Sequence, residues 1–299
     1  MNIAAIYTCF NRKEKTLESL RSLFQSIDNY NSLFRENVNV FVYLTDDGCT
    51  DGTADAVKRE FSDKDIHILQ GDGHLYWAGG MRLAWSKAFE RHSEWSYYLL
   101  LNDDTVINQN CIHELLESER YCQSMYGLFG IISGITCSSN DENVITYGGD
   151  IIANKFTGRQ IRLGKSSVPQ LVDITNANIL LVPSPVVEKI GIFYEGYIHS
   201  GADNDYSMAA RKKGIPVLIT SNVCGKCDND HHDLDTDSSR IMKMTLKERR
   251  AYYYHPLHSI KDYLVFIRRN MPIRYPFSWL FCMIRLFFPK LYFTINEIR

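Results

Sequence analysis

The chain has 299 residues, of which 45% are hydrophobic and 23% charged, with a formal net charge of −2. This composition predicts a globular protein with one large core or a core plus an appendage, and it gives no basic excess, so we expect no nucleic-acid partner. Eight scattered cysteines indicate reduced thiols in a cytoplasm rather than a disulfide scaffold. We expect neither a signal peptide nor a membrane-spanning helix, because no suitable apolar run occurs.

The first hundred residues predict strands and helices in alternation. The expected strands are apolar runs at 2–8, 38–44, 66–69 and 97–101. Helices are expected over about 13–28, from an N-cap at Thr53, and from Gly79-Gly80 to about 91. This βαβαβ order implies a largely parallel sheet with right-handed crossovers.

The rest of the chain changes character twice. Residues 125–175 are interpreted as hairpins and loops. Beyond them we expect a strand at 178–182, helices at 184–190 and 203–213, and a last sheet strand at 215–220. After about 235 the sequence becomes helical, basic and aromatic, so we divide the chain into a domain over 1–235 and a C-terminal extension over 236–299.

Acids or polar groups follow several of the predicted strands. They lie at Thr8–Arg12, Asp46-Asp47, Asn102-Asp103-Asp104 and Asp203/Asp205. The carboxyl ends of parallel strands meet at one edge of the sheet, where carboxylates suit a hard divalent cation and that cation suits a diphosphate. A dinucleotide-binding site is disfavoured, because neither a Gly-x-Gly-x-x-Gly turn nor a P-loop follows the first strand.

Five motifs in order carry a resemblance to a known family. They are Thr-Cys-Phe-Asn-Arg (8–12), Thr-Asp-Asp-Gly-Cys-Thr-Asp-Gly-Thr (45–53), Trp-Ala-Gly-Gly-Met (77–81), Leu-Leu-Leu-Asn-Asp-Asp-Thr (99–105) and Gly-Ala-Asp-Asn-Asp-Tyr (201–206). Over roughly residues 1–235 the chain resembles family 2 glycosyltransferases, most of all bacterial cell-surface polysaccharide enzymes such as rhamnosyl- and galactofuranosyltransferases. The resemblance implies an α/β, Rossmann-like GT-A fold: a mostly parallel mixed sheet flanked by helices.

The resemblance also implies a donor site for a UDP- or dTDP-sugar. Residues Thr8, Asn11 and Arg12 would line the nucleotide pocket, and Asp46 or Asp47 would accept the N–H of the base. The segment Asn102-Asp103-Asp104 stands where the family has its Asp-x-Asp metal motif, with Asp104 as the direct ligand of Mg²⁺ or Mn²⁺. This chain departs from the motif at Asn102, whose contact would be to the sugar or ribose.

The same resemblance places the catalytic base of an inverting transfer at Asp203. One base has to take the proton of the acceptor hydroxyl, and a divalent ion would stabilise the departing diphosphate. Asp205, two residues on, is the rival and would otherwise contact substrate. Family members usually have an acid before the base, where this chain has Ala202.

Two further groups have a structural alternative. His231 or His232 would supply a third metal ligand; the alternatives are a polar surface loop, or a structural zinc site shared with Cys224 and Cys227. Trp77 would form a sugar-stacking wall with Tyr76, or both would be core aromatics. Gly79 and Gly80 would let a helix N-terminus approach the donor.

The segment 266–299 has six basic residues, one acid and many aromatics, divided by prolines. This pattern is typical of an interfacial segment, so we expect peripheral association with the inner face of the cell membrane and a glycan or lipid-linked acceptor. The alternatives are a helical subdomain packed on the catalytic domain, or an oligomer contact.

Two other functions compete with glycosyl transfer. A sugar-nucleotide nucleotidyltransferase would need a glycine-rich phosphate loop after the first strand, which this chain lacks. A nucleotide-sugar-binding protein with impaired catalysis is the other alternative, prompted by Asn102 and Ala202.

Overall fold

The computed structural model describes residues 1–155, 157–228 and 238–297. Its main sheet has ten strands, with the order β10-β13-β6-β12-β4-β1-β2-β3 and with β5 and β7 paired to β13 and β6. The strands are β1 (Asn2–Cys9), β2 (Asn39–Asp46), β3 (Ile66–Gln70), β4 (Tyr97–Leu101), β5 (Val106–Ile107), β6 (Ile131–Cys137), β7 (Ile145–Tyr147), β10 (Gln170–Leu171), β12 (Ile179–Pro183) and β13 (Val217–Lys226).

The sheet is mixed. Strands β3, β2, β1 and β4 run parallel to one another, and β6 and β13 are parallel to each other. Strand β12 lies antiparallel between β4 and β6. A small second sheet contains β8 (Gly149–Asn154), β9 (Arg159–Arg162) and β11 (Ile174–Thr175). The expected α/β architecture, a mixed sheet flanked by helices, is therefore confirmed.

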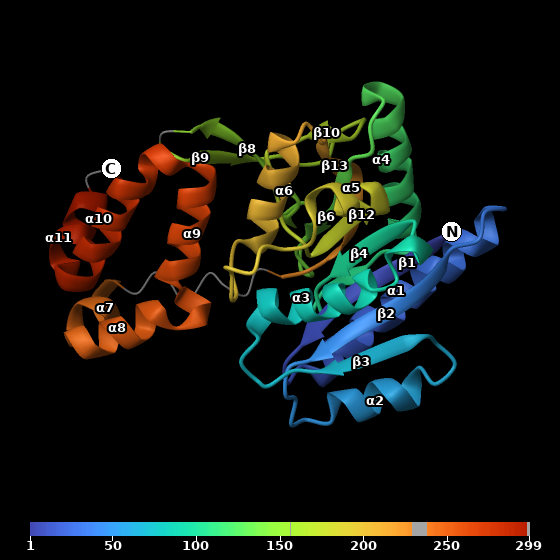
Figure 1. Cartoon of the computed structure of the whole chain (residues 1–299), viewed down its shortest axis with the longest axis horizontal. Helices are drawn as coiled ribbons and strands as arrows, with labels where there is room; N and C mark the ends of the chain where they lie inside the picture. The colour runs from blue at the N-terminus through green and yellow to red at the C-terminus, as the bar shows by residue number, and fades with distance from the viewer. Residues whose placement is uncertain (156, 229–237, 298–299) are drawn as a thin grey trace.

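Helices cover both faces of the main sheet (Figure 1). One face carries α1 (Lys13–Leu33), α2 (Thr53–Glu60) and α4 (Cys111–Tyr126); the other carries α3 (Tyr76–Phe89), α5 (Ser184–Ile190) and α6 (Ala202–Lys212). Strand β1 shows why two cores form. Its side chains alternate, so Ile3, Ala5 and Tyr7 pack against α1, while Ala4 and Ile6 pack against α3.

The strand expected at 97–101 is confirmed at both ends as β4.

Three expectations are corrected. Residues 131–137 lie within the segment predicted as hairpins and loops but form β6, whose residues are all buried. A strand buried on both faces has no alternating pattern to reveal it. Thr53 is not an N-cap: Gly52, at φ 78°, precedes the helix and Thr53 is its first residue. Helix α3 begins at Tyr76, ahead of Gly79-Gly80.

The extension after 235 is helical, as expected. It contains α7 (Ser238–Lys243), α8 (Leu246–Tyr254), α9 (Ile260–Asn270), α10 (Tyr275–Phe287) and α11 (Pro289–Glu297). These helices enclose a small apolar cluster of their own, and α9 packs against α6 (Figure 1). In the described part of the chain, no helix is long and apolar enough to cross a membrane.

Candidate functional site

Polar side chains from three adjacent parallel strands meet at the carboxyl edge of the sheet. The register pairs Thr8 with Thr45 and Cys9 with Asp46, and β4 lies on the other side of β1. From the turn after β1, the Nη1 atom of Arg12 lies 2.6 Å from Oδ2 of Asp104 and 3.4 Å from Oδ1 of Asp103. The structure thus brings the ends of β1 and β4 together through direct ion pairs.

The two acids after β4 have different environments. Asp103 is 7% exposed, and burial raises its pKa to about 7, while the positive charge of Arg12 acts in the opposite direction. Asp104 also accepts a hydrogen bond from the thiol of Cys227, whose Sγ lies 3.6 Å from Oδ1. At neutral pH the pair therefore carries less than two full negative charges before any cation binds.

Asn102, the departure from the family motif, is held by Trp77. The indole Nε1 donates a hydrogen bond of 2.8 Å to Oδ1 of Asn102, and the Trp77 ring packs against Phe193 with centroids 5.6 Å apart. An amide oxygen satisfies this indole donor without placing a third charge beside Asp103 and Asp104. Trp77 therefore packs against the core at the start of α3 and holds Asn102, while its sugar-stacking role stays a prediction.

The adjacent acids at the end of β2 differ in what they bind. Both carboxylate oxygens of Asp47 accept backbone N–H groups, from Gly73 (2.9 Å), Leu75 (3.3 Å) and Tyr76 (2.9 Å). Asp47 therefore holds the loop that leads into α3. Asp46 accepts the backbone N–H of Cys49 at 2.7 Å through Oδ1 alone. Of the two residues, Asp46 is the better candidate for contact with a nucleobase.

The glycines of α3 bring that helix close to the sheet. A Cβ atom on Gly80 would lie 2.0 Å from Oγ1 of Thr8, so only glycine permits this packing of α3 on β1. The backbone N–H of Gly79 donates to the carbonyl of Ile198 at 3.4 Å. Asn11, at φ 51°, accepts the backbone N–H of Thr50 at 2.7 Å and so fixes the turn after β1.

Asp203 lies in the first turn of α6 and is 8% exposed. Its Oδ2 accepts the backbone N–H of Ala177 at 3.1 Å, and burial raises its pKa. Asn178 follows Ala177 in the chain. Its backbone carbonyl accepts the backbone N–H of Asn102 at 3.3 Å, and its side-chain amide donates to Sγ of Cys227 at 3.3 Å. A continuous set of contacts therefore joins Asp203 to the Asn102–Asp104 segment.

Sequence reasoning did not identify Asn178 or Cys227 as parts of this set. Asn178 lies in no recognisable motif, and the sequence indicates Cys227 only as a possible zinc ligand together with Cys224. Asn178 precedes β12, the neighbour of β4, and Cys227 follows β13, which pairs with β5 just after Asp104. Only this strand pairing brings both residues beside the Asn102–Asp104 segment.

Asp205 does not face the site, contrary to expectation. It is 3% exposed, and both of its oxygens lie 3.0 Å from Nε of Arg269, while Nδ2 of Asn270 lies 2.6 Å from Oδ1. Residues two apart on a helix point in different directions, so Asp203 turns toward the sheet and Asp205 toward α9. The prediction of Asp205 as a substrate contact is therefore wrong.

An acid of α9, Asp262, supports the backbone just before α6. Asp262 is 1% exposed and accepts the backbone N–H groups of His199 (2.8 Å) and Ser200 (3.0 Å). These residues immediately precede Gly201 and α6. The extension therefore contacts the segment around Asp203 on both sides, through Asp262 before it and Arg269 after it.

The expected third metal ligands, His231 and His232, lie outside the described residues. Cys224 is fully buried in the apolar core with its Sγ 3.4 Å from Thr220 Oγ1, so it is not placed to share a zinc ion with Cys227 at the site. Within the described ranges, Cys9, Asp46 and Cys49 do have ligand atoms within 4.8 Å of one another. Thiols suit soft metals and not Mg²⁺ or Mn²⁺, so this trio is not the expected divalent-ion site.

Comparison with known proteins gives a family match over part of the chain and a fold similarity over most of it. Residues 5–120 match the family model for glycosyl transferase family 2. The fold resembles S. aureus TarS 1–349: the UDP-GlcNAc complex aligns with TM-score 0.55 and 15% identity over 91% of this chain and 73% of that one. The UDP complex aligns with TM-score 0.53 and 15% identity over 75% of this chain and 59% of that one. No curated protein sequence matches the chain.

At 15% identity the structural similarity establishes the fold alone, and the family model adds a match over residues 5–120. The expected recognition is supported: residues 5–120 are of the glycosyl transferase family 2 type, and the whole fold resembles that of the TarS structures. The matched segment, 5–120, includes Arg12, Asp46 and Asn102–Asp104 but ends before Asp203.

Proposed function

We propose that the protein is an inverting, metal-dependent glycosyltransferase that moves a sugar from a UDP- or dTDP-sugar to a hydroxyl group of a cell-surface glycan or lipid-linked acceptor. The observation that carries this proposal is the linkage of Asp203 to the Asn102–Asp104 segment through Ala177 and Asn178. A base and a diphosphate-binding edge must lie beside each other for a single in-line displacement.

The donor nucleotide is assigned to the ends of β1 and β2. Asp46 would accept the imino N–H that uracil and thymine both carry, and Thr8, Asn11 and Arg12 would line the pocket. The TarS structures named for UDP and UDP-GlcNAc support a nucleotide-sugar donor for this fold. Trp77 would form a stacking wall for the sugar, and Asn102 would contact the sugar or ribose.

Asp103 and Asp104 offer hard carboxylate oxygens, which suit Mg²⁺ or Mn²⁺. Asp104 would hold the ion, with one of His231 and His232 as a further ligand, and a bound divalent ion would stabilise charge on the departing diphosphate. Arg12 already places a positive charge against the same carboxylates, which supports the presence of a cation at this edge. Arg12 would also contribute positive charge toward a diphosphate.

Asp203 would take the proton of the acceptor hydroxyl. Its burial raises its pKa, which makes the carboxylate a better proton acceptor. The fixed contact to the N–H of Ala177 sets the orientation of the carboxylate without supplying a competing positive charge.

The test compares three variants by their kcat and by their binding of UDP or dTDP. Asp203→Asn should lower kcat by at least about 10²-fold while leaving UDP or dTDP binding nearly intact, because the base acts in the transition state. Asp104→Ala should remove the tightening of nucleotide binding by Mg²⁺ or Mn²⁺. Asp205→Asn is the matched control and should retain the chemistry. Near-normal turnover in Asp203→Asn, or equal nucleotide affinity with and without metal, would refute the corresponding assignment.

We also propose that the extension associates with the inner face of the cell membrane. Large apolar side chains on and on either side of α10 are exposed, including Ile273 (76%), Phe277 (59%) and Phe288 (63%). Truncation near residue 265 would be a poor test, because it removes Arg269 and leaves Asp205 buried without its ion pair. Point substitutions on this apolar surface avoid that damage.

A further inference from the structure

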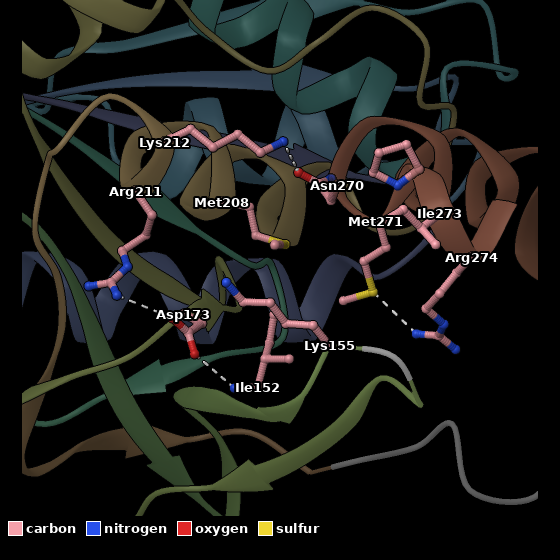
Figure 2. A pocket seen from close by; sticks show the side chains of 11 residues that line it. Ile152, Lys155, Asp173, Met208, Arg211, Lys212, Asn270, Met271, Ile273 and Arg274 are labelled. Carbon is pink, nitrogen blue, oxygen red and sulfur yellow. Dashed lines mark hydrogen bonds and ion pairs between the residues drawn. The ribbon is translucent and has the colours of Figure 1, made fainter.

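A cavity of about 570 Å³ lies where the extension meets the catalytic domain, away from the strand ends described above. It opens between the β8–β9 hairpin, the C-terminal end of α6 and the 3₁₀ turn η3 (Pro272–Arg274), as Figure 2 shows. Met208 is the lining residue of α6 nearest to Asp203; it lies five residues further on, so the cavity begins about 7.5 Å along the helix axis from Asp203.

Positive charge dominates this cavity. Its lining includes four basic residues and one acid: Lys155, Arg211, Lys212 and Arg274 against Asp173. The difference is +3, in a chain whose formal net charge is −2. A local excess of this sign concentrates anions at the surface where it lies.

Only one of these cations is neutralised by direct contact with the acid. Nη2 of Arg211 lies 3.2 Å from Oδ1 of Asp173. The Nζ atom of Lys212 instead donates to two neutral acceptors at 2.7 Å, the carbonyl of Arg269 and Oδ1 of Asn270. Within the described residues, no acid is in contact with Lys155.

The position of Arg274 is set by the opposite hairpin. Its Nη1 donates to Sδ of Met271 at 3.2 Å, and a Cβ atom on Gly158 would lie 1.9 Å from that same Nη1. Gly158, at φ 72°, therefore lets the hairpin turn close over the guanidinium. Figure 2 shows Arg274, from the extension, at one end of the cavity, and Lys155, from the hairpin, reaching across it toward Met208 and Arg211.

The remaining wall is apolar and continues onto the exposed surface. Ile152 and Met208 come from the catalytic domain, while Met271 and Ile273 come from the extension. Ile273 is 76% exposed, and Phe277, about one helical turn further along, is 59% exposed. The ligand that matches the basic residues together with this apolar wall has an anionic head and an apolar chain.

We propose that this cavity binds the phosphate group of an anionic amphiphile, a lipid phosphate at the membrane surface, with its apolar chain lying along Ile273 and Phe277. Guanidinium and ammonium groups are the usual partners of phosphate oxygens. The inference rests on the membrane association in the proposed function and names the lipid chemistry that the extension recognises. It does not involve Asp203 or the donor site.

The experiment measures binding of dodecyl phosphate, below its micelle concentration, to the full chain by calorimetry. Two parallel measurements serve as comparisons. Inorganic phosphate has the phosphate group without the chain, and dodecyl maltoside has the chain with an uncharged head group. Lys155→Gln/Arg274→Gln should weaken dodecyl phosphate binding at least tenfold. Lys58→Gln, an exposed lysine on α2, is the matched control and should leave it unchanged.

Saturable dodecyl phosphate binding that depends on Lys155 and Arg274, with much weaker binding in both other arms, supports the proposal. Equal binding of inorganic phosphate would overturn the lipid assignment, and equal binding of dodecyl maltoside would overturn the phosphate assignment. Unchanged binding in the double variant would overturn the site. UDP binding, measured on the same samples, reports separately on the donor site, so failure of the cavity is distinguishable from failure of the enzyme.

Discussion

The ion pair between Asp205 and Arg269 should stabilise the fold and not take part in the chemistry. The Asp205 side chain is 4% exposed and that of Arg269 33%. Arg269→Ala would leave a buried carboxylate with Asn270 as its remaining partner. It would also remove the contact of the guanidinium with the Tyr194 ring, whose centroid lies 3.8 Å from Cζ.

Breaking a fully buried pair costs about 3–5 kcal/mol. Because Arg269 is one-third exposed, solvent screens part of that loss, and we expect about 3 kcal/mol. Domains of 150–250 residues lose about 2–4 °C in Tm for each kcal/mol, so for this larger chain the lower end applies and the expected fall is about 6 °C.

The assay is thermal and urea unfolding of Arg269→Ala, Asp205→Ala and the double variant. The double variant should be clearly less destabilised than the sum of the single losses, because the two residues form one interaction. Arg268→Ala, at the exposed neighbouring position, is the control and should change stability little. Additive losses, or an Asp205→Asn variant of full stability with no turnover, would refute this account and return Asp205 to the chemistry.

Two further predictions concern the donor edge. Gly80→Ala should lower the free energy of unfolding by about 1–3 kcal/mol and weaken nucleotide binding, because the new Cβ would lie 2.0 Å from Thr8 Oγ1; Gly164→Ala, where the nearest atom is 3.9 Å away, is the control in the same unfolding assay. Burial raises the pKa of Asp103 to about 7, so its contribution to stability is full below about pH 4 and is lost as pH rises through 7. Between pH 4 and 8, wild-type protein should therefore lose stability relative to Asp103→Asn in urea unfolding without added metal, and parallel pH profiles would contradict the assigned environment.

The parts of the fold that the sequence predicts well are those with local signals. Strand β4 is a continuous apolar run that ends in acids, and both features lie within nine residues. Helix α4 also has a local signal, since Ile112, Leu115, Leu116 and Cys122 are buried at helical spacing. Our sequence prediction nevertheless did not include it.

Other parts have no local signal at all. Asp205 and Asp203 look equivalent in sequence, and what separates them is Arg269, 64 residues from Asp205. Asp47 looks like a second candidate for base recognition, yet its partners are backbone N–H groups of a loop 26–29 residues away. Backbone amides occur at every position of a chain, so a sequence cannot show which carboxylate they will occupy.

The extension differs from the rest of the chain in composition, but its contacts also support the site. Asp262 binds the N–H groups of residues 199 and 200, and Arg269 binds Asp205, so a single helix fixes the backbone on both sides of Asp203. Without α9, those N–H groups and the Asp205 carboxylate would lose their protein partners, and each buried unsatisfied group costs about 1–3 kcal/mol. The boundary at 235/236 therefore marks a change in composition, whereas the geometry of Asp203 depends on residues on both sides of it.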